Sequence, residues 1–311
     1  MNLKNKRILL TGGAGFLGQA VQKKLCEQGV MDKNIYIPRH KDLDLRIWEN
    51  CLQAVNHEDI VIHIAANCGG IQYNIQNPGK LYFDNVMMNT QIMEAARIAD
   101  VEKFVNIGCI CAYPKDIPLP FKEEDFFNGE IESTNAPYGY VKRAALVQTQ
   151  AYRQEYGMDA IYLLPVNLYG PNDNFHPEYS HVIPGLIRKF IEAKENGGRD
   201  VIVWGTGKAS REFLYVEDCA EAILLATEKY SKPDPVNLGS GQEIKIKDLV
   251  NLIAELTDFN GKIFWDKSKP DGQPRRKLDV SKAKEEFGFK AETDFREGLK
   301  KTIEWWKENR K

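Results

Sequence analysis

The chain carries almost no excess of charge of either sign. Its 311 residues include 42 Lys and Arg against 44 Asp and Glu, a formal net charge of -2. Proteins that follow the phosphate backbone of nucleic acid or an anionic membrane surface need a basic excess, so we expect neither partner here. With 43% hydrophobic residues, the chain is still long enough to bury a large core.

Long apolar runs are also missing. No stretch approaches the ~20 apolar residues that a membrane-spanning helix needs. The first residues, MNLKNKRILLTGG, pass directly from polar residues into an expected strand, without the apolar segment of a targeting signal. We therefore expect a cytoplasmic protein that does not enter a membrane.

Cysteine is scarce and follows no framework of spacings. Of six cysteines, only Cys109 and Cys111 lie close together in the sequence. Intracellular chains of this size normally keep their thiols reduced, which argues against disulfides. Zinc sites usually combine Cys-x-x-Cys pairs with nearby histidines, and that pattern is absent, so we expect no metal. Cys26, Cys51 and Cys219 fall on apolar helix faces and are expected in the core.

Short apolar runs alternate with helical patterns over the first half of the chain. Helical patterns, including long ones near 81–99 and 138–156, separate the strand patterns RILLT, NIYI, IVIHIAA, KFVNIG and AIYLLP. These strands are apolar without strict polar alternation, as expected where helices cover both faces of a parallel sheet. The order predicts an α/β fold with a doubly wound parallel sheet of the Rossmann type.

The pattern loosens after residue 170, where prolines interrupt the chain. We expect residues 1–170, with a returning segment 211–238, to form a dinucleotide-binding domain. Residues 171–210 and 239–311 are expected to form a smaller substrate lobe that includes two late helices.

Three glycines stand three residues apart at the first expected turn from strand to helix. In TGGAGFLG, Gly12, Gly15 and Gly18 lie between the strand RILL and an amphipathic helix. Glycine lets the backbone turn tightly and approach a pyrophosphate, while the start of the helix directs free N–H groups toward that anion. The motif predicts a dinucleotide site; the alternative is a purely structural glycine turn.

The end of the second expected strand indicates which dinucleotide binds. A site for NAD usually offers a carboxylate to the ribose 2′-hydroxyl, about 20 residues past the glycines. This chain has IYIPRHK there, and Arg39, with His40 and Lys41, is suited to a 2′-phosphate. We therefore predict NADP, with a solvated basic loop as the alternative.

The motif YGYVK places a tyrosine and a lysine on one helix face. Tyr138 and Lys142 are four residues apart in a helical segment, so the lysine lies one turn beyond the tyrosine. A nearby ammonium lowers the pKa of a phenol from its ordinary value of about 10. We predict that Tyr138 donates a proton to a carbonyl oxygen.

These motifs follow one another in a recognisable order: the glycine turn, the AANCGG segment, a polar loop after the fourth expected strand, and YGYVK. The set resembles the extended short-chain dehydrogenase/reductase family. The resemblance implies that Tyr138 is the catalytic acid/base and that Lys142 also holds the nicotinamide ribose. It further implies a Ser or Thr that grips the substrate oxygen, and Cys109 occupies that position here.

Longer segments are similar to the GDP-L-fucose synthase family: CGGIQ at 68–72, CICAYP at 109–114, PVNLYGPNDNFHPEYSHVIP at 165–184 and WGTGKASREFLYVEDCA at 204–220. The resemblance implies epimerisation of a 4-keto sugar at C3 and C5, followed by reduction at C4 with NADPH. It implies that Cys111 and His181 exchange protons on opposite faces of the sugar. A single group would return each proton to the face that it came from.

The same resemblance implies further binding residues. Arg211, with Arg188 and Lys189, is expected to neutralise the GDP pyrophosphate. Trp204 is expected to stack on the substrate or to lie in the core. Asn167 is expected near both nicotinamide and substrate. The implied cofactor contacts, besides Arg39, are Gly12, Gly15, Phe16, Leu17, Gly18, Ala65, Ala66, Tyr138, Lys142, Pro165, Asn167, Leu168 and His181.

The thiol of Cys109 departs from the family pattern, because a thiol is a much weaker hydrogen-bond donor than a hydroxyl. This leaves a different GDP-linked 4-keto sugar, such as a heptose or a dideoxy sugar, or a mainly epimerising enzyme, as alternatives. An NAD-retaining nucleotide-sugar 4-epimerase or dehydratase and a non-catalytic NADP-binding protein are the others. Since residues two apart in an extended segment point the same way, we expect Cys109 and Cys111 both to face the sugar.

The resemblance also implies a homodimer, formed through the expected helices near 81–99 and 138–156. Cys68 lies in a loop near the expected cofactor and has no assigned role.

Overall fold

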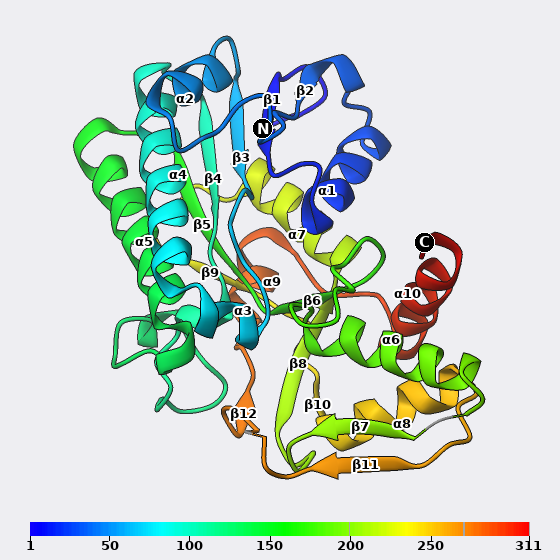
Figure 1. Cartoon of the computed structure of the whole chain (residues 1–311). Helices are drawn as coiled ribbons and strands as arrows, with labels where there is room; N and C mark the ends of the chain where they lie inside the picture. The colour runs from blue at the N-terminus through cyan, green and yellow to red at the C-terminus, as the bar shows by residue number, and fades with distance from the viewer. Residues whose placement is uncertain (199, 270, 311) are drawn as a thin grey trace.

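A six-stranded parallel sheet forms the larger part of the molecule (Figure 1). The computed structural model describes residues 1–198, 200–269 and 271–310. The strands are ordered β2-β1-β3-β4-β5-β9, and each neighbouring pair is parallel. Their bounds are β1 Ile8–Thr11, β2 Ile35–Tyr36, β3 Ile60–His63, β4 Lys103–Ile107, β5 Ala160–Pro165 and β9 Val236–Leu238. This confirms the predicted doubly wound α/β sheet.

Helices cover both faces of this sheet, which explains the unbroken apolar strands. One face carries α1 (Phe16–Glu27) and α7 (Val216–Lys229), and the other carries α2 (Trp48–Val55), α4 (Pro78–Ile98) and α5 (Ala136–Tyr156). Within β1, Ile8 and Leu10 pack into the core on the α1 and α7 side of the sheet, which we call the first core. Leu9 packs into the core on the α2 and α4 side, which we call the second core. Alternate side chains of one strand therefore enter opposite layers, so both must be apolar.

A smaller lobe with its own core lies below the sheet in Figure 1. Strand β8 lies between β10 and β12 and also pairs with β6, while β7 pairs with β11. The bounds in this region are β6 Asn167–Tyr169, α6 Val182–Glu195, β7 Val201–Trp204, β8 Ser210–Tyr215, β10 Glu243–Lys245, α8 Ile246–Leu256, β11 Ile263–Asp266, β12 Arg275–Arg276 and α10 Phe295–Asn309.

The C-terminal third of the chain differs from expectation in two ways. After residue 239 it contains three helices in the described residues rather than two, because α9 (Ser281–Phe287) lies between α8 and α10. Residues Ala283, Phe287 and Phe289 pack into the first core, beside the large sheet, although we expected this segment in the lobe. The chain therefore returns to the sheet once more than the sequence pattern indicates.

Short helices complete the fold and shape the loops between the larger elements. They are α3 Ile71–Gln76, η1 Asp32–Asn34, η2 Ile110–Ala112, η3 Glu123–Asp125 and η4 Ser133–Asn135. No helix in the described part of the chain is long and apolar enough to cross a membrane.

The cysteines that were expected in the core divide into two groups. Cys51 and Cys219 are buried, as predicted. The prediction is wrong for Cys26, which is exposed near the end of α1, where its thiol donates to Asp32 at 3.1 Å. The helix face that carries Cys26 therefore turns to solvent over its last turn.

A buried carboxylate joins the two parts of the molecule. Glu212 in β8 is fully buried and accepts the backbone N–H groups of Gly241 and Leu278, each at 2.7 Å. Burial raises the pKa of Glu212, and the backbone donors oppose that rise. These bonds tie the chain at Gly241 and at Leu278 to strand β8.

We expect Glu212→Gln to lower the free energy of unfolding by about 1–3 kcal/mol, because an amide N–H would face a backbone N–H in a buried site. Urea unfolding followed by circular dichroism measures the change. Glu297→Gln is the control, since Glu297 is 56% exposed in a surface ion pair with Lys300, and its effect should stay within about 0.5 kcal/mol. Equal unfolding curves for Glu212→Gln and the unmodified protein would show that the buried carboxylate does not stabilise the fold.

Candidate active site

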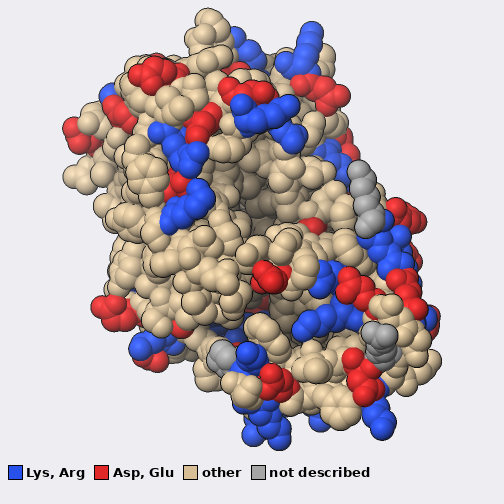
Figure 2. Space-filling model, in the orientation of Figure 1, with Lys and Arg blue, Asp and Glu red and all other residues tan. Residues whose placement is uncertain are grey.

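The predicted motifs meet at the carboxyl ends of the parallel strands. The glycine turn follows β1, the AANCGG segment follows β3, and the two neighbouring thiols follow β4. The face of the molecule in Figure 2 is hollowed between the large sheet and the lobe. Ligands of open α/β sheets bind at this edge.

The glycine turn has the close backbone packing that a pyrophosphate site requires. Gly12 adopts a φ of +71°, and a Cβ there would lie 2.7 Å from the backbone nitrogen of Ala65. A Cβ on Gly18 would lie 2.2 Å from the carbonyl oxygen of Gly12. Within the described residues, no side chain caps the first turn of α1. Its N–H groups are therefore available to an anion, so the turn fits a dinucleotide.

The loop after β2 offers an exposed cation, Arg39. Arg39 is exposed and forms no ion pair within the described ranges, while its carbonyl accepts the N–H groups of Asp42 and Leu43. One carboxylate of the loop, Asp44, is held by Arg46 at 2.6 Å, whereas the exposed Asp42 directs its N–H to the carbonyl of Arg39. The hydrogen bond from Arg46 is the main reason that the pKa of Asp44 falls to about 2. The arrangement fits a 2′-phosphate better than a 2′-hydroxyl.

Lys142 is the buried cation of the site. Its ammonium donates to the carbonyl of Ile107 at 2.7 Å and lies 5.6 Å from the centre of the Tyr138 ring. Burial lowers the pKa of Lys142, and the nearby thiols oppose this shift. The spacing in YGYVK therefore does bring the two side chains together.

The pKa of Tyr138 is shifted in the direction opposite to the one predicted. Burial, followed by the neighbouring thiols, raises its pKa well above the ordinary value. The prediction of a lowered pKa for Tyr138 is thus wrong for the protein alone, because burial penalises the charged phenolate. Tyr138 consequently remains protonated, which is the state that a proton donor requires.

The two neighbouring thiols lie on a turn rather than on an extended segment. Cys109 is extended, but the chain then enters the 3-10 helix η2, and the N–H of Ala112 donates to the carbonyl of Cys109 at 3.2 Å. Arg143 in α5 holds the turn by donating to the carbonyl of Ala112 at 2.9 Å. The expectation of a continuous extended segment from Cys109 to Cys111 is therefore wrong.

The turn nevertheless places the thiols in contact. Burial raises the pKa of Cys109, but the side-chain hydrogen bond from Cys111 and the charge of Lys142 outweigh it, so the pKa falls below its ordinary value. The same hydrogen bond, followed by burial, holds the pKa of Cys111 well above its ordinary value. The pair thus favours a thiolate on Cys109 with the thiol of Cys111 as its donor.

Cys68 belongs to the same group of side chains. It follows β3, and its charge affects the pKa values of Tyr138 and Lys142. The sequence offered no role for it, and the structure adds only this proximity.

The residues predicted from the segment at 165–184 lie at the junction with the lobe. Pro165 ends β5, and Asn167 and Leu168 lie in β6. The amide of Asn167 donates to the carbonyl of Glu212 at 3.0 Å. His181 is the residue before α6, and its imidazole is half exposed, 4.0 Å from the carboxylate of Asp173.

Two arginines lie side by side on the lobe. Arg211 in β8 pairs in register with Arg276 in β12, and neither forms an ion pair among the residues described. Burial, followed by the charge of Arg276, lowers the pKa of Arg211 to about 10. Arg211 donates to the carbonyl of Ser210 at 2.7 Å and Arg276 donates to the side chain of Gln273, so neither positive charge is neutralised by a described carboxylate and an anion would fit there. The sequence analysis missed Arg276, although the run DGQPRRKLD could have indicated it.

Arg188 and Lys189, the other cations predicted to bind the substrate, point in different directions from α6. Lys189 donates to the carbonyl of Ile202 at 3.1 Å and lies 5.7 Å from the centre of the Trp204 ring. Arg188 instead lies 3.4 Å from Glu192 and lines a cavity with Trp306. Consecutive helix residues point about 100° apart, so the structure does not group Arg188 with Lys189.

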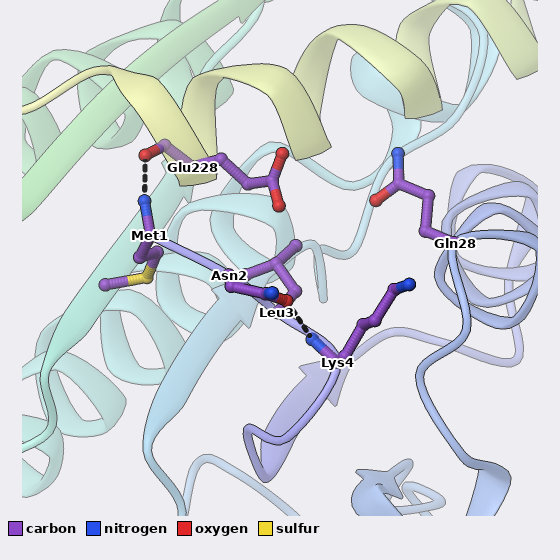
Figure 3. A pocket seen from close by; sticks show the side chains of 6 residues that line it. All are labelled: Met1, Asn2, Leu3, Lys4, Gln28 and Glu228. Carbon is purple, nitrogen blue, oxygen red and sulfur yellow. Dashed lines mark hydrogen bonds between the residues drawn. The ribbon is translucent and has the colours of Figure 1, made fainter.

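A further cavity lies at the opposite edge of the sheet (Figure 3). Met1, Lys4, Gln28 and Glu228 contribute to it, and Figure 3 shows the amino group of Met1 bonded to the carbonyl of Glu228. These residues lie before β1 and at the ends of α1 and α7. In a parallel sheet that is the amino edge, away from the thiols and Tyr138, so this cavity is separate from the candidate active site.

The parallel sheet, the glycine turn and the Tyr–Lys pair define a dinucleotide-binding enzyme of the extended short-chain dehydrogenase/reductase class. A family model described as the NAD dependent epimerase/dehydratase family matches residues 8–239. The chain is 41% identical over 311 residues to GDP-L-fucose synthase 1 of Arabidopsis thaliana, covering 99% of this chain and 95% of that protein.

Solved structures agree with this assignment. A GDP-L-fucose synthetase from Naegleria fowleri bound to NADP matches with a TM-score of 0.88 and 30% identity, over 98% of this chain and 95% of that one. A GDP-6-OMe-4-keto-L-xylo-heptose reductase from C. jejuni matches with a TM-score of 0.90 and 26% identity, over 98% of each chain. The chain belongs to the NAD dependent epimerase/dehydratase family. The resemblance predicted from the sequence is thereby confirmed.

We expect the coupled thiols to give one thiolate that titrates below the range of an ordinary cysteine. Ultraviolet absorbance of the thiolate against pH measures it in the protein without ligand. Cys109→Ser should abolish this low titration, because Cys109 holds the charge. Cys111→Ser should move it upward by less, since a hydroxyl still donates to Cys109. A low titration that persists in Cys109→Ser would contradict this assignment of the charge.

Proposed function

We propose that this protein epimerises a GDP-linked 4-keto-6-deoxy sugar at C3 and C5 and then reduces C4 with NADPH, as expected of a GDP-L-fucose synthase. The observation that carries the proposal is the grouping of two kinds of proton-transfer residue in one site. The thiols of Cys109 and Cys111 lie next to Tyr138 and Lys142, and His181 lies before α6, on the loop whose Tyr179 carbonyl accepts the N–H of Gly70 after β3. The chain that contains them matches GDP-L-fucose synthase 1 of Arabidopsis thaliana over 99% of its length.

NADP would be held by residues at the carboxyl edge of the large sheet and at its junction with the lobe. The free N–H groups after Gly12, Gly15 and Gly18 receive the pyrophosphate, and Arg39 receives the 2′-phosphate. The remaining contacts come from Phe16, Leu17, Ala65, Ala66, Tyr138, Lys142, Pro165, Asn167, Leu168 and His181. When bound, NADPH supplies the hydride for the reduction at C4.

Epimerisation uses the thiols as base and His181 as acid. The 4-ketone acidifies the C–H bonds at C3 and C5, so a base of moderate strength suffices. Cys111 takes the proton from carbon while its own proton passes to the thiolate of Cys109. The carbon–hydrogen electron pair moves into the enolate, whose oxygen lies at Tyr138. His181 returns a proton to the opposite face of the carbon, which inverts it.

Reduction uses the same phenol. Tyr138 is protonated in the protein alone and gives its proton to O4 as C4 becomes an alcohol carbon. Lys142 stabilises the phenolate that remains, because its ammonium lies over the ring of Tyr138 at 5.6 Å. Cys109 has no proton to donate as a thiolate and is a weak donor once protonated, so Tyr138 carries most of the polarisation of the ketone.

The GDP part of the substrate lies along the lobe. Arg211 and its neighbour Arg276 bind the pyrophosphate, and Lys189 adds a third cation next to Trp204. Arg188, which we expected here, serves the substrate less directly because it faces Glu192 and Trp306.

A reductase acting on a GDP-linked 4-keto heptose is the second candidate. The observation in its favour is the match to the C. jejuni reductase, with a TM-score of 0.90. An NAD-retaining 4-epimerase is disfavoured, because the loop at Arg39 offers a cation where such an enzyme needs a carboxylate.

A homodimer and a cytoplasmic location belong to the same proposal. Tyr82 and Phe83 on α4, and Val147 on α5, are 49%, 55% and 53% exposed, and the two helices pack side by side. Large apolar side chains on adjacent helices indicate a protein interface. A second copy of the chain would cover them by forming a four-helix contact.

The proposal is tested by incubating the protein with GDP-4-keto-6-deoxy-mannose and NADPH in deuterated water. We expect NADPH oxidation and deuterium at C3 and C5 of the product. Cys111→Ser should slow deuterium incorporation by about 10²–10⁴-fold, because the base is lost, while retaining some NADPH oxidation. Tyr138→Phe should abolish NADPH oxidation. NADPH oxidation without deuterium at either carbon would support the reductase alternative and contradict the epimerase. The absence of both NADPH oxidation and deuterium incorporation would refute both functions.

A further inference from the structure

Asp173 is a buried carboxylate with an unsatisfied oxygen. It lies in the loop between β6 and α6 and is only 7% exposed. One oxygen accepts the N–H of Asn174 at 2.7 Å, whereas Oδ2 is buried without a hydrogen-bond partner among the described residues. Burying a carboxylate in this way is costly, and such groups are retained where a cation or a donor completes them.

The neighbouring donor is the imidazole of His181, which faces Oδ1 rather than the unpartnered Oδ2, at a separation that a rotation of the half-exposed ring would shorten to a hydrogen bond. Nδ1 of His181 lies 4.0 Å from Oδ1 of Asp173, and no side-chain cap bond from His181 to α6 occupies the ring. Asp173 is therefore the carboxylate that faces Nδ1 of this ring.

The loop that carries both residues is fixed from two directions. Phe175 stacks on Trp306 of α10 with ring centres 4.2 Å apart and planes 8° apart. On the opposite side, the N–H of Gly70 donates to the carbonyl of Tyr179 at 2.9 Å. Asp173 therefore has little freedom to rotate into water, and the orientation of its carboxylate is built into the loop.

We propose that Asp173 is a positioning residue for His181: it accepts the proton on Nδ1 and thereby presents Nε2 to the sugar carbon. The inference rests on the proposed function in so far as His181 is the acid of the epimerisation. Fixing one ring nitrogen by a carboxylate determines the tautomer and the direction of the other nitrogen. In catalysis the proton leaves Nε2 for carbon and is replaced from solvent, while the Nδ1 proton stays shared with Asp173.

Cys68 is a further titratable neighbour of Asp173, and the charge of Asp173 acts on its thiol. The thiol lies on the loop after β3, whereas the imidazole lies at α6. Replacing Asp173 therefore affects two groups, and the test must report on the imidazole itself.

The first measurement is nitrogen NMR of the histidine side chains in the protein without ligand. The His181 signals are assigned from their absence in His181→Asn. In the unmodified protein we expect the proton on Nδ1; Asp173→Ala should lose this preference, and Asp173→Asn, which keeps an acceptor oxygen, should retain it in part. Glu178→Ala is the matched control, because Glu178 is an exposed acidic residue of the same loop, and it should leave the spectrum unchanged.

The second measurement is the rate of deuterium incorporation at C3 and C5 against NADPH oxidation. Asp173→Ala should reduce the incorporation rate at saturating substrate by about 10–100-fold with KM little changed, and Asp173→Asn should recover part of it. An unchanged His181 tautomer in Asp173→Ala would overturn the inference, whatever the rates. If the unmodified protein incorporated no deuterium, the proposed function would fail, while the NMR result would still decide whether Asp173 orients His181.

Discussion

The hydrogen bond from the buried ammonium of Lys142 to the carbonyl of Ile107 fixes the geometry of the site. It joins α5 to the end of β4 at 2.7 Å. The carbonyl of Lys142 in turn accepts the hydroxyl of Tyr162 in β5 at 2.6 Å, so the helix is held against two adjacent strands. Tyr138 lies one turn before Lys142, and Cys109 lies two residues after Ile107. Both reacting groups therefore take their positions from one buried cation.

The remaining groups reach this cation from different parts of the chain. The lobe contributes Arg211 and Arg276, which lie on neighbouring strands and share no carboxylate partner among the residues described. The loop between β6 and α6 contributes His181, on a segment that Phe175 fixes to α10. A sugar nucleotide that contacts all of them must bridge the sheet and the lobe. The arrangement thus favours a substrate with an anionic diphosphate at one end and a ketone at the other.

The features predicted well from the sequence are those set by local patterns. The apolar strands, the glycine turn and the Tyr138–Lys142 spacing depend on short-range geometry, and the structure shows all of them. The failures depend on contacts between distant segments. The turn at Cys109 is held by Arg143, the pairing of Arg211 with Arg276 depends on strand order, and burial reverses the shift expected for Tyr138. No single-sequence pattern encodes these contacts.

The most direct test of this account is a thiolate titration of Lys142→Met, followed by ultraviolet absorbance, with the fold checked by circular dichroism. Methionine keeps an unbranched apolar side chain and removes the ammonium. If the buried cation organises the site, the pKa of the Cys109–Cys111 pair rises above that of the unmodified protein, because the charge that favours the thiolate is gone. An unchanged titration in a folded Lys142→Met protein would contradict the account.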